Sequence, residues 1–285
     1  MSRLRTRHSV EISVVIPTFN RAQTLGRALK SVLTQDEPAD ELIVVDDGST
    51  DETAVLLAQE YPQVRVIRQE NQGVSAARNT GIGAAAHPWL AFLDSDDEWL
   101  PSKLAVQRRA LAEHPELRFC HADEIWIRNG KRVNPMKKHA KQGGWIYDQC
   151  LALCCISPSA VVMHRSIFEE VGLFDVSLPA AEDYDLWLRL CARYEVLFVS
   201  EKLLTRYGGH QDQLSQKYWG MDRFRVVALS KMLRSSQLPE TQRCATVEML
   251  CRKLRVLNNG ARKRENCELA SECRKMAAEF GISLA

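Results

Sequence analysis

The chain has 285 residues, of which 45% are hydrophobic and 26% are charged. These values are typical of globular proteins and exclude a disordered, collagen-like or coiled-coil chain. The 38 Lys and Arg nearly balance the 36 Asp and Glu, so the net charge of +2 gives no argument for nucleic acid binding by the whole chain.

No uncharged stretch reaches the roughly 20 residues that a membrane-spanning helix needs. The N-terminal sequence lacks the long apolar region and the cleavage site of a secretory signal, so we expect a cytoplasmic protein. The nine cysteines include no CxxC pair, which favours reduced, structural thiols.

The first part of the chain alternates between predicted strands and helices. Short apolar runs predict strands at 12–17, 41–46, 64–69 and 89–94. Helices are expected over 25–33, from the segment "DDGSTDET" to about Tyr61, and over 75–86. This alternation predicts βαβ units and a parallel sheet between helices. Ligands of such sheets bind beyond the carboxyl ends of the strands, here residues 17–21, 46–51 and 94–97.

The later elements are less regular. We expect helices over 102–114 and 182–194, and strands within 118–127, 160–164 and 196–200. Two or three helices are expected over 219–280, with turns at 235–240 and 258–263.

A change in charge divides the chain near residue 217. Residues 217–285 hold 14 Lys and Arg and 7 Asp and Glu, a net of +7, whereas residues 1–216 have a net of −5. We therefore predict an N-terminal extension (1–11), a catalytic domain (12–216) and a basic helical C-terminal segment (217–285).

Two predicted strand ends are rich in carboxylates. In "LDSDDEW", Asp94 and Asp96 would lie on the same side of an extended chain, away from Asp97, and could share a hard cation such as Mg²⁺ or Mn²⁺. Solvated residues that cap a helix are the alternative. In "VVDDGSTDET", Asp46 and Asp47 could bind a ligand, or the segment could be a plain βα turn with a helix cap.

Taken together, five segments resemble the family-2 glycosyltransferases with the GT-A fold: "VVIPTFNRAQTLGRALKSVLTQ", "ELIVVDDGSTDET", "NQGVSAARNTGI", "WLAFLDSDDEW" and "EDYDLWLRL". The resemblance covers residues 12–215. It implies an α/β fold with a Rossmann-like nucleotide-binding half on a mostly parallel sheet and a mixed acceptor-side half, followed here by the C-terminal helices.

The resemblance also implies a nucleotide-sugar donor, a UDP-sugar by family prevalence, and a divalent cation that bridges its diphosphate. Asp46 or Asp47 would bind the base, Arg78 would assist, Asp94 would contact the ribose and Asp96 would ligate the metal. The full predicted nucleotide-binding set is Pro17, Thr18, Asn20, Arg21, Asp46, Asp47, Arg78, Asp94 and Ser95.

The same family places its general base at the start of a helix. By resemblance we predict Asp183 as the base, Glu182 as an acceptor or sugar contact, and inversion at the anomeric carbon. An acidic first turn that complements the helix dipole is the alternative. In "RYGGHQDQLSQ", His210 would ligate the metal or contact phosphate with help from Arg206, although a structural role for the His stays open.

The sequence therefore predicts a metal-dependent inverting glycosyltransferase that acts on a glycan or lipid-linked glycan acceptor in cell-surface polysaccharide or glycolipid synthesis. A sugar-nucleotide nucleotidyltransferase is the alternative enzyme, but the first turn, "IPTFNRAQ", lacks the glycines that its phosphate loop requires. A non-catalytic module that binds sugar nucleotides or nucleic acid is the other alternative function. Few aromatics accompany the basic residues of the C-terminal segment, so we expect no nucleic acid there and suggest contact with the catalytic domain or an anionic membrane.

Overall fold

The computed structural model describes residues 10–209, 218–235 and 238–284. Within them one nine-stranded sheet has the order β3-β2-β1-β4-β8-β6-β9-β5, with β7 paired to β6. The strands are β1 (Ile12–Thr18), β2 (Glu41–Asp46), β3 (Arg65–Arg68), β4 (Trp89–Phe92), β5 (Glu98–Trp99), β6 (Phe119–Arg128), β7 (Lys131–Val133), β8 (Val161–His164) and β9 (Leu197–Gly208).

The first four strands of this order form a parallel half-sheet, as the sequence predicts. Val15 of β1 pairs with Ile43 of β2 on one side and with Phe92 of β4 on the other. Every residue of β1 is buried, as expected of a mainly apolar strand inside a parallel sheet. The carboxyl ends of β1, β2 and β4 consequently meet at one edge.

Strand direction changes next to β4. Strand β8 runs antiparallel to β4 and to β6, whereas β9 runs parallel to β6. The loop after β4 therefore lies where the two halves of the sheet meet. Strand β9 is longer than the predicted 196–200, because its second half pairs with both β6 and β5.

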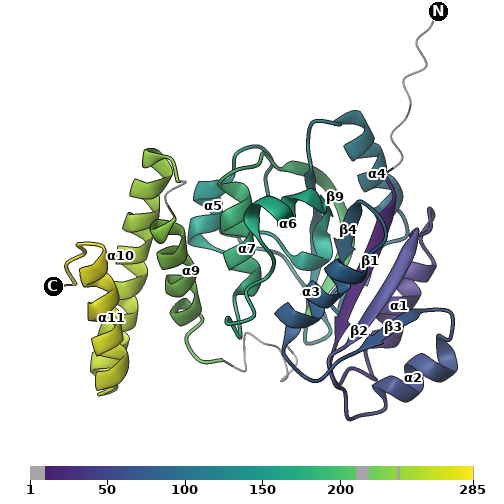
Figure 1. The fold of residues 1–285 in the computed structure, drawn as a ribbon, viewed down its shortest axis with the longest axis horizontal. Coiled ribbons are helices and arrows are strands. Elements are labelled where there is room, and N and C mark those ends of the chain that lie inside the picture. Colours follow the sequence, from purple (N-terminus) through teal and green to yellow (C-terminus); the bar gives the residue numbers. More distant parts are fainter. Residues whose placement is uncertain (1–9, 210–217, 236–237, 285) are drawn as a thin grey trace, which may run out of the picture.

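Helices cover both faces of the sheet (Figure 1). One face packs against α1 (Leu25–Leu33), α2 (Thr53–Glu60) and α4 (Lys103–Glu113). The other packs against α3 (Val74–Ala84), α5 (Tyr147–Ala152), α6 (Ser166–Val171) and α7 (Glu182–Cys191). Two short 3-10 helices, η1 (Lys137–His139) and η2 (Pro158–Ala160), precede α5 and β8.

Helix α3 approaches β1 closely at Gly81. A Cβ atom built there would lie 2.3 Å from Cγ1 of Val15. Only glycine fits at this distance, so Gly81 sets how near the helix lies to the strand.

The C-terminal helices are α9 (Asp222–Arg234), α10 (Glu240–Lys263) and α11 (Cys267–Glu279). Figure 1 shows them as a layer outside α5 and α7, with α9 nearest to the rest of the protein. Their apolar side chains, such as Leu229 and Leu250, belong to the same hydrophobic cluster as α5 and α7. The hydroxyls of Tyr147 and Thr246 form a buried hydrogen bond of 2.7 Å between α5 and α10.

The predicted turn at 258–263 is wrong, because α10 continues to Lys263. Asn258 and Ala261 are buried on its packed side, so tertiary packing overrides the turn tendency of "NNG". The chain turns only at Glu265, whose φ is 55°, and Asn266 then caps α11 by accepting a bond from the N–H of Leu269 at 2.9 Å. Within the described ranges, every helix is too short or too polar to cross a membrane.

Candidate active site

The loop after β1 is tied to the turn after β2 through Asn20. Its side-chain oxygen accepts hydrogen bonds from the N–H groups of Thr50 (2.8 Å) and Asp51 (3.3 Å), and its own N–H donates to Ser49 at 2.9 Å. The N–H of Arg21 donates to Thr53 at 2.9 Å. Asn20 and Arg21, both predicted to bind nucleotide, thus hold the two loops together.

Both predicted base-binding carboxylates are buried and already accept hydrogen bonds. Asp46 accepts from the N–H of Ser49 at 2.9 Å. Asp47 accepts from the Gln69 side chain (2.7 Å) and from the N–H groups of Gln72 (3.0 Å) and Gly73 (2.8 Å). These carboxylates fix the backbone at the edge of the sheet, and a direct contact of either with a base stays a prediction.

Two further residues of the predicted nucleotide set lie at the end of β1. Pro17 pairs with Val45 in the parallel ladder. The Thr18 hydroxyl is buried and has no hydrogen-bond partner among the described residues, so it is a polar atom that a ligand at this edge could satisfy.

The carboxylates after β4 lie on a turn, and the predicted extended chain is wrong. The N–H of Asp97 donates to the carbonyl of Asp94 at 3.0 Å, which closes the turn around the buried Ser95. Asp97 points inward, where it accepts from the Ser159 hydroxyl (2.6 Å) and from the N–H of Tyr207 (3.0 Å). Burial, followed by the nearby carboxylates of Asp96 and Asp94, raises the pKa of Asp97 well above its usual value.

The backbone of Asp96 is held from the other side by Arg27. The guanidinium donates to the Asp96 carbonyl at 2.5 Å and lies 3.7 Å from the centre of the Tyr207 ring. Asp96 is partly exposed. Among the residues that the structure describes, no three His, Cys, Asp or Glu side chains form a ready metal site, and His210 lies outside those residues.

Arg78 joins the two predicted halves of the site. It projects from α3, is 2% exposed, and donates to Asp94 and to Glu182 at 2.7 Å each. Burial lowers the pKa of Arg78, but the two carboxylates outweigh this effect and raise it. Asp94, which is predicted to contact the ribose, is thereby connected to the first residue of α7.

Helix α7 places Glu182 and Asp183 at its start. Ala181 adopts a φ of 60° just before them, an unfavourable conformation for a residue with a side chain, of a kind found at functional sites. Glu182 is buried, whereas Asp183 is partly exposed. Burial and the neighbouring Asp183 raise the pKa of Glu182, and Arg78 opposes this shift.

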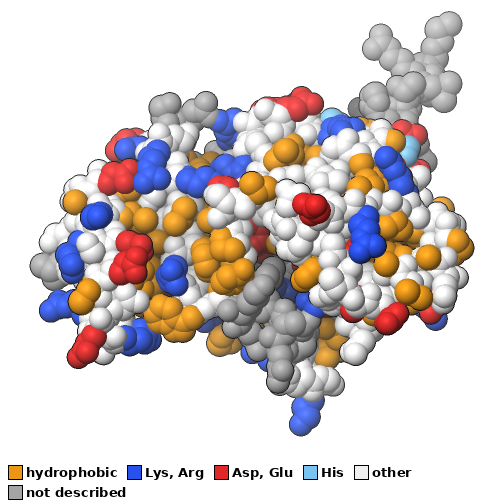
Figure 2. Space-filling model, turned by 60° about the horizontal axis from the view of Figure 1, so that its bottom comes forward, with side chains coloured by type: hydrophobic (Ala, Val, Ile, Leu, Met, Phe, Trp, Pro, Cys, Tyr) orange, Lys and Arg blue, Asp and Glu red, His pale blue; other side chains and the backbone are white. Residues whose placement is uncertain are grey.

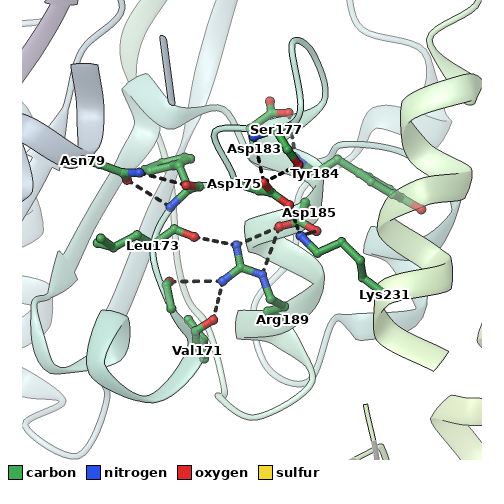
Figure 3. A network of polar contacts seen from close by, with 12 residues as sticks. Asn79, Val171, Leu173, Asp175, Ser177, Asp183, Tyr184, Asp185, Arg189 and Lys231 are labelled. Carbon is green, nitrogen blue, oxygen red and sulfur yellow. Dashed lines mark hydrogen bonds and ion pairs between the residues drawn. The ribbon is translucent and has the colours of Figure 1, made fainter. Parts of the chain in front are cut away.

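The rest of α7 is fixed by a polar network (Figure 3). Asp185 is 1% exposed and pairs with Arg189 at 2.8 Å and with Lys231 of α9 at 2.7 Å. Arg189 also donates to the carbonyls of Val171 and Leu173. The helix that carries Asp183 is therefore anchored both to the preceding loop and to the C-terminal helices.

Arg206 of β9 lies among several acids. Its guanidinium is 4.0 Å from the Glu124 carboxylate. Desolvation lowers the pKa of Arg206, but the carboxylates of Glu124, Asp97, Asp94 and Asp183 outweigh this effect and raise it. Its side chain is 45% exposed, so it can also meet a ligand. The sequence predicted only a supporting role for it.

Two residues at the site were missed by the sequence reasoning. Ser159 hydrogen bonds with both Asp94 and Asp97, and the Cys154 thiol lies 3.1 Å from the Asp183 carboxylate. Both belong to a segment whose pattern predicts no helix or strand. Pro158 was the one signal there, since it marks a fixed turn next to Ser159.

These features define a Rossmann-like α/β fold with a carboxylate-rich site at the carboxyl ends of its strands. Residues 13–172 match the family model of glycosyl transferase family 2. The chain belongs to this family.

Three known proteins illustrate the relationship. The UDP-Glc:alpha-D-GlcNAc-diphosphoundecaprenol beta-1,3-glucosyltransferase WfgD of Escherichia coli is 31% identical over 63% of this chain and 69% of its own. Staphylococcus aureus TarS 1–349 in complex with UDP-GlcNAc has a TM-score of 0.69 at 19% identity over 86% of this chain and 72% of its own. The mannosyltransferase PcManGT from Pyrobaculum calidifontis, in complex with GDP-Man and Mn²⁺, has a TM-score of 0.61 at 18% identity over 94% of this chain and 79% of its own.

The two structural similarities show the GT-A-like α/β fold alone. The chain spans about a third of the length of the first curated relatives that it matches, with 33%, 32% and 28% of their residues covered.

Proposed function

We propose that the chain is a metal-dependent inverting glycosyltransferase. It would move a sugar from a nucleoside-diphosphate sugar to an acceptor hydroxyl in the synthesis of a cell-surface polysaccharide or glycolipid. Residues 12–216 would form the catalytic domain, and residues 217–285 a basic helical segment.

The observation that carries this proposal is the position of Arg78. By bonding to Asp94 and Glu182 at 2.7 Å each, it connects the predicted donor-binding turn to the predicted catalytic helix. A sugar held beyond Asp94 would thus lie beside Asp183. A nucleotide-binding module without catalysis has no need of this connection.

The residues near Asp96 suit a divalent cation. Asp94, Asp96 and Asp97 bring negative charge together, since Asp96 and Asp94 add to the effect of burial in raising the pKa of Asp97. Mg²⁺ commonly binds through one or two carboxylates plus substrate phosphates. Asp96 would hold the metal, with His210 as a further ligand, and a bound metal would neutralise charge on the leaving diphosphate.

Asp183 would act as the general base. It is partly exposed, and it lies next to Glu182, whose carboxylate is engaged by Arg78. The Asp183 carboxylate would accept the proton of the acceptor hydroxyl as that oxygen attacks the anomeric carbon. Attack from the face opposite the leaving diphosphate would invert the anomeric configuration, and Glu182 would contact the sugar or the acceptor.

A UDP-sugar and a lipid-linked acceptor are the favoured substrates. TarS is known in complex with UDP-GlcNAc, and WfgD is named for transfer from UDP-Glc to a diphosphoundecaprenol-linked sugar. The protein would act in the cytoplasm, at the inner face of the membrane where such an acceptor is anchored.

The C-terminal segment would provide the membrane contact. Trp219 and Val256 are exposed and line a groove together with Arg225, Lys263 and Arg264. Lys and Arg side chains are spread over the part of the surface formed by the C-terminal helices (Figure 2). An aromatic ring beside basic groups suits the interface of an anionic membrane. Flotation with acidic vesicles at low and moderate salt tests this contact, and an absence of salt-sensitive binding would remove it.

A donor panel tests the enzymatic proposal. Release of nucleoside diphosphate from UDP-glucose, UDP-GlcNAc, UDP-galactose and GDP-mannose is measured with and without Mn²⁺, using α-GlcNAc-diphosphoundecaprenol as the acceptor probe. We expect metal-dependent release that Asp96→Ala abolishes. Asp183→Asn should keep donor binding and lose transfer, and full activity in this variant would refute the assigned base.

A further inference from the structure

The thiol of Cys154 contacts the carboxylate that we assign as the base. Its Sγ lies 3.1 Å from Oδ2 of Asp183, and the other carboxylate oxygen, Oδ1, accepts the N–H of Tyr184 at 2.7 Å. Each oxygen of Asp183 therefore has a donor within the chain, one from the start of its own helix and one from Cys154.

The segment that carries Cys154 is fastened to the same helix as Asp183. The Tyr184 hydroxyl donates to the carbonyl of Leu151 at 2.7 Å, and the Trp187 indole N–H donates to the carbonyl of Ile156 at 2.9 Å. Both aromatic side chains are buried on α7. Because α7 holds the segment on both sides of Cys154, the contact between the thiol and Asp183 is set by α7 itself.

The thiol is the donor in this contact. Burial and the neighbouring Asp183 carboxylate raise the pKa of Cys154 well above its usual value, so the sulfur keeps its proton. The carbonyl of Ile156 is a second acceptor at 3.4 Å, but the Asp183 oxygen is nearer and carries charge. Hydrogen bonds to charged acceptors are the stronger ones.

We propose that Cys154 is a positioning residue that orients the Asp183 carboxylate toward the acceptor hydroxyl. The inference rests on the proposed function of Asp183 as base. A thiol suits this task because it donates weakly. It fixes the direction of the carboxylate, whereas a strong donor would also stabilise the anion and make it a poorer base.

The test compares four variants with the wild-type full chain. Cys154→Ala removes the donor, Cys154→Val removes it and fills the space with a somewhat larger apolar side chain, and Cys154→Ser keeps a donor at the same place. Cys155→Ala is the matched control, since the Cys155 thiol is 3.4 Å from Cys150 and belongs to the same segment. Each variant is measured for kcat and donor KM with the best donor of the panel, for UDP binding by calorimetry, and for Tm.

We expect Cys154→Ala and Cys154→Val to lower kcat about tenfold with unchanged donor KM and UDP affinity. Cys154→Ser keeps the direction of the carboxylate but donates more strongly, so its kcat should lie between those of Cys154→Ala and the wild type, whereas Cys155→Ala should stay within about threefold of the wild type. A merely structural role would lower Tm and UDP binding together with kcat, and Cys154→Val would then recover what Cys154→Ala loses. Either that pattern, or a kcat of Cys154→Ala within twofold of wild type, overturns the inference.

The two proposals fail separately. If Asp183→Asn is inactive and Cys154→Ala is fully active, only the role of Cys154 is wrong. If Asp183→Asn is fully active, the assigned base is wrong, whatever the Cys154 variants do.

Discussion

The guanidinium of Arg78 and the carboxylate of Glu182 lie 2.7 Å apart, although 104 positions separate them in the chain. Both side chains are nearly inaccessible, with 3% and 6% exposed. The pair crosses from the parallel half of the fold to α7, and its second partner, Asp94, completes a three-residue bridge.

Replacing Arg78 should therefore be severely destabilising. Arg78→Met leaves the buried Glu182 carboxylate without its cation, and breaking such a pair costs about 3–5 kcal/mol of unfolding free energy. Urea denaturation measures this loss. The control is Arg68→Met, which removes an exposed partner of Asp46 3.7 Å away and should change stability little. Equal effects in both variants would contradict a special role for Arg78.

Breaking the contact between α7 and α9 should lower the free energy of unfolding less than replacing Arg78 does. Lys231 lies 2.7 Å from the buried Asp185 and 2.5 Å from Asp175. Lys231→Met should lower the free energy of unfolding by about 1–3 kcal/mol, because Asp185 retains only Arg189. Arg234→Met, on the same helix, removes an exposed pair with Glu279 and should leave Tm almost unchanged. An unchanged Tm for Lys231→Met would show that Arg189 alone suffices.

The burial of Lys103 should make the stability of the protein depend on pH. Its side chain is fully buried, 3.9 Å from the Trp99 ring centre and 2.6 Å from the Gln107 oxygen, and burial lowers its pKa to about 7. An unfolded lysine holds its proton up to about pH 10. Between about pH 7 and 10 the unfolded state thus binds more protons, and stability rises with pH by up to about 1.4 kcal/mol per unit.

Lys103→Met should remove this rise and stabilise the protein at pH 7. Urea unfolding at several pH values between 7.5 and 9.5 measures the slope. Lys30→Met, at an exposed position of α1, should keep the wild-type slope. A slope that Lys103→Met leaves unchanged would assign the pH dependence to other groups.

Replacing each of two glycines of α3 with alanine should have opposite effects on stability. At Gly81 the new Cβ meets Val15 at 2.3 Å, whereas at Gly83 it meets nothing within 4 Å. Gly81→Ala should destabilise by about 1–3 kcal/mol through overpacking, and Gly83→Ala should stabilise by about 0.4–1 kcal/mol. Thermal unfolding measures both, and Val15→Ala should relieve part of the Gly81→Ala loss. Similar Tm values for the two variants would contradict the close approach of α3 to β1.

The sequence predicts the parallel half of the sheet well, because local apolar runs mark its strands. It predicts the position of Asp94, Asp96 and Asp97 after β4, but not the turn that directs Asp97 toward Ser159 and Tyr207. That turn depends on partners far away in the chain.

The same limit explains what was missed around α7. The acidic start of the helix is visible in the sequence, whereas the thiol of Cys154 reaches Asp183 only through side chains that anchor a loop without periodic pattern. The error at 258–263 has a related cause. The turn signal of Asn and Gly is local, and it is overridden because Asn258 and Ala261 are buried on the packed side of α10.

The hydrogen bond between Tyr147 and Thr246 has a consequence for the order of folding. The parallel half-sheet can form as soon as the first hundred residues are made, since domains fold from the N-terminus during synthesis. Helices α5 and α7 cannot bury their outer sides until α9 and α10 emerge. The helix that carries Asp183 is thus covered only by the final quarter of the chain, so a chain that ends before α9 would have its parallel half-sheet formed and the outer side of α7 exposed.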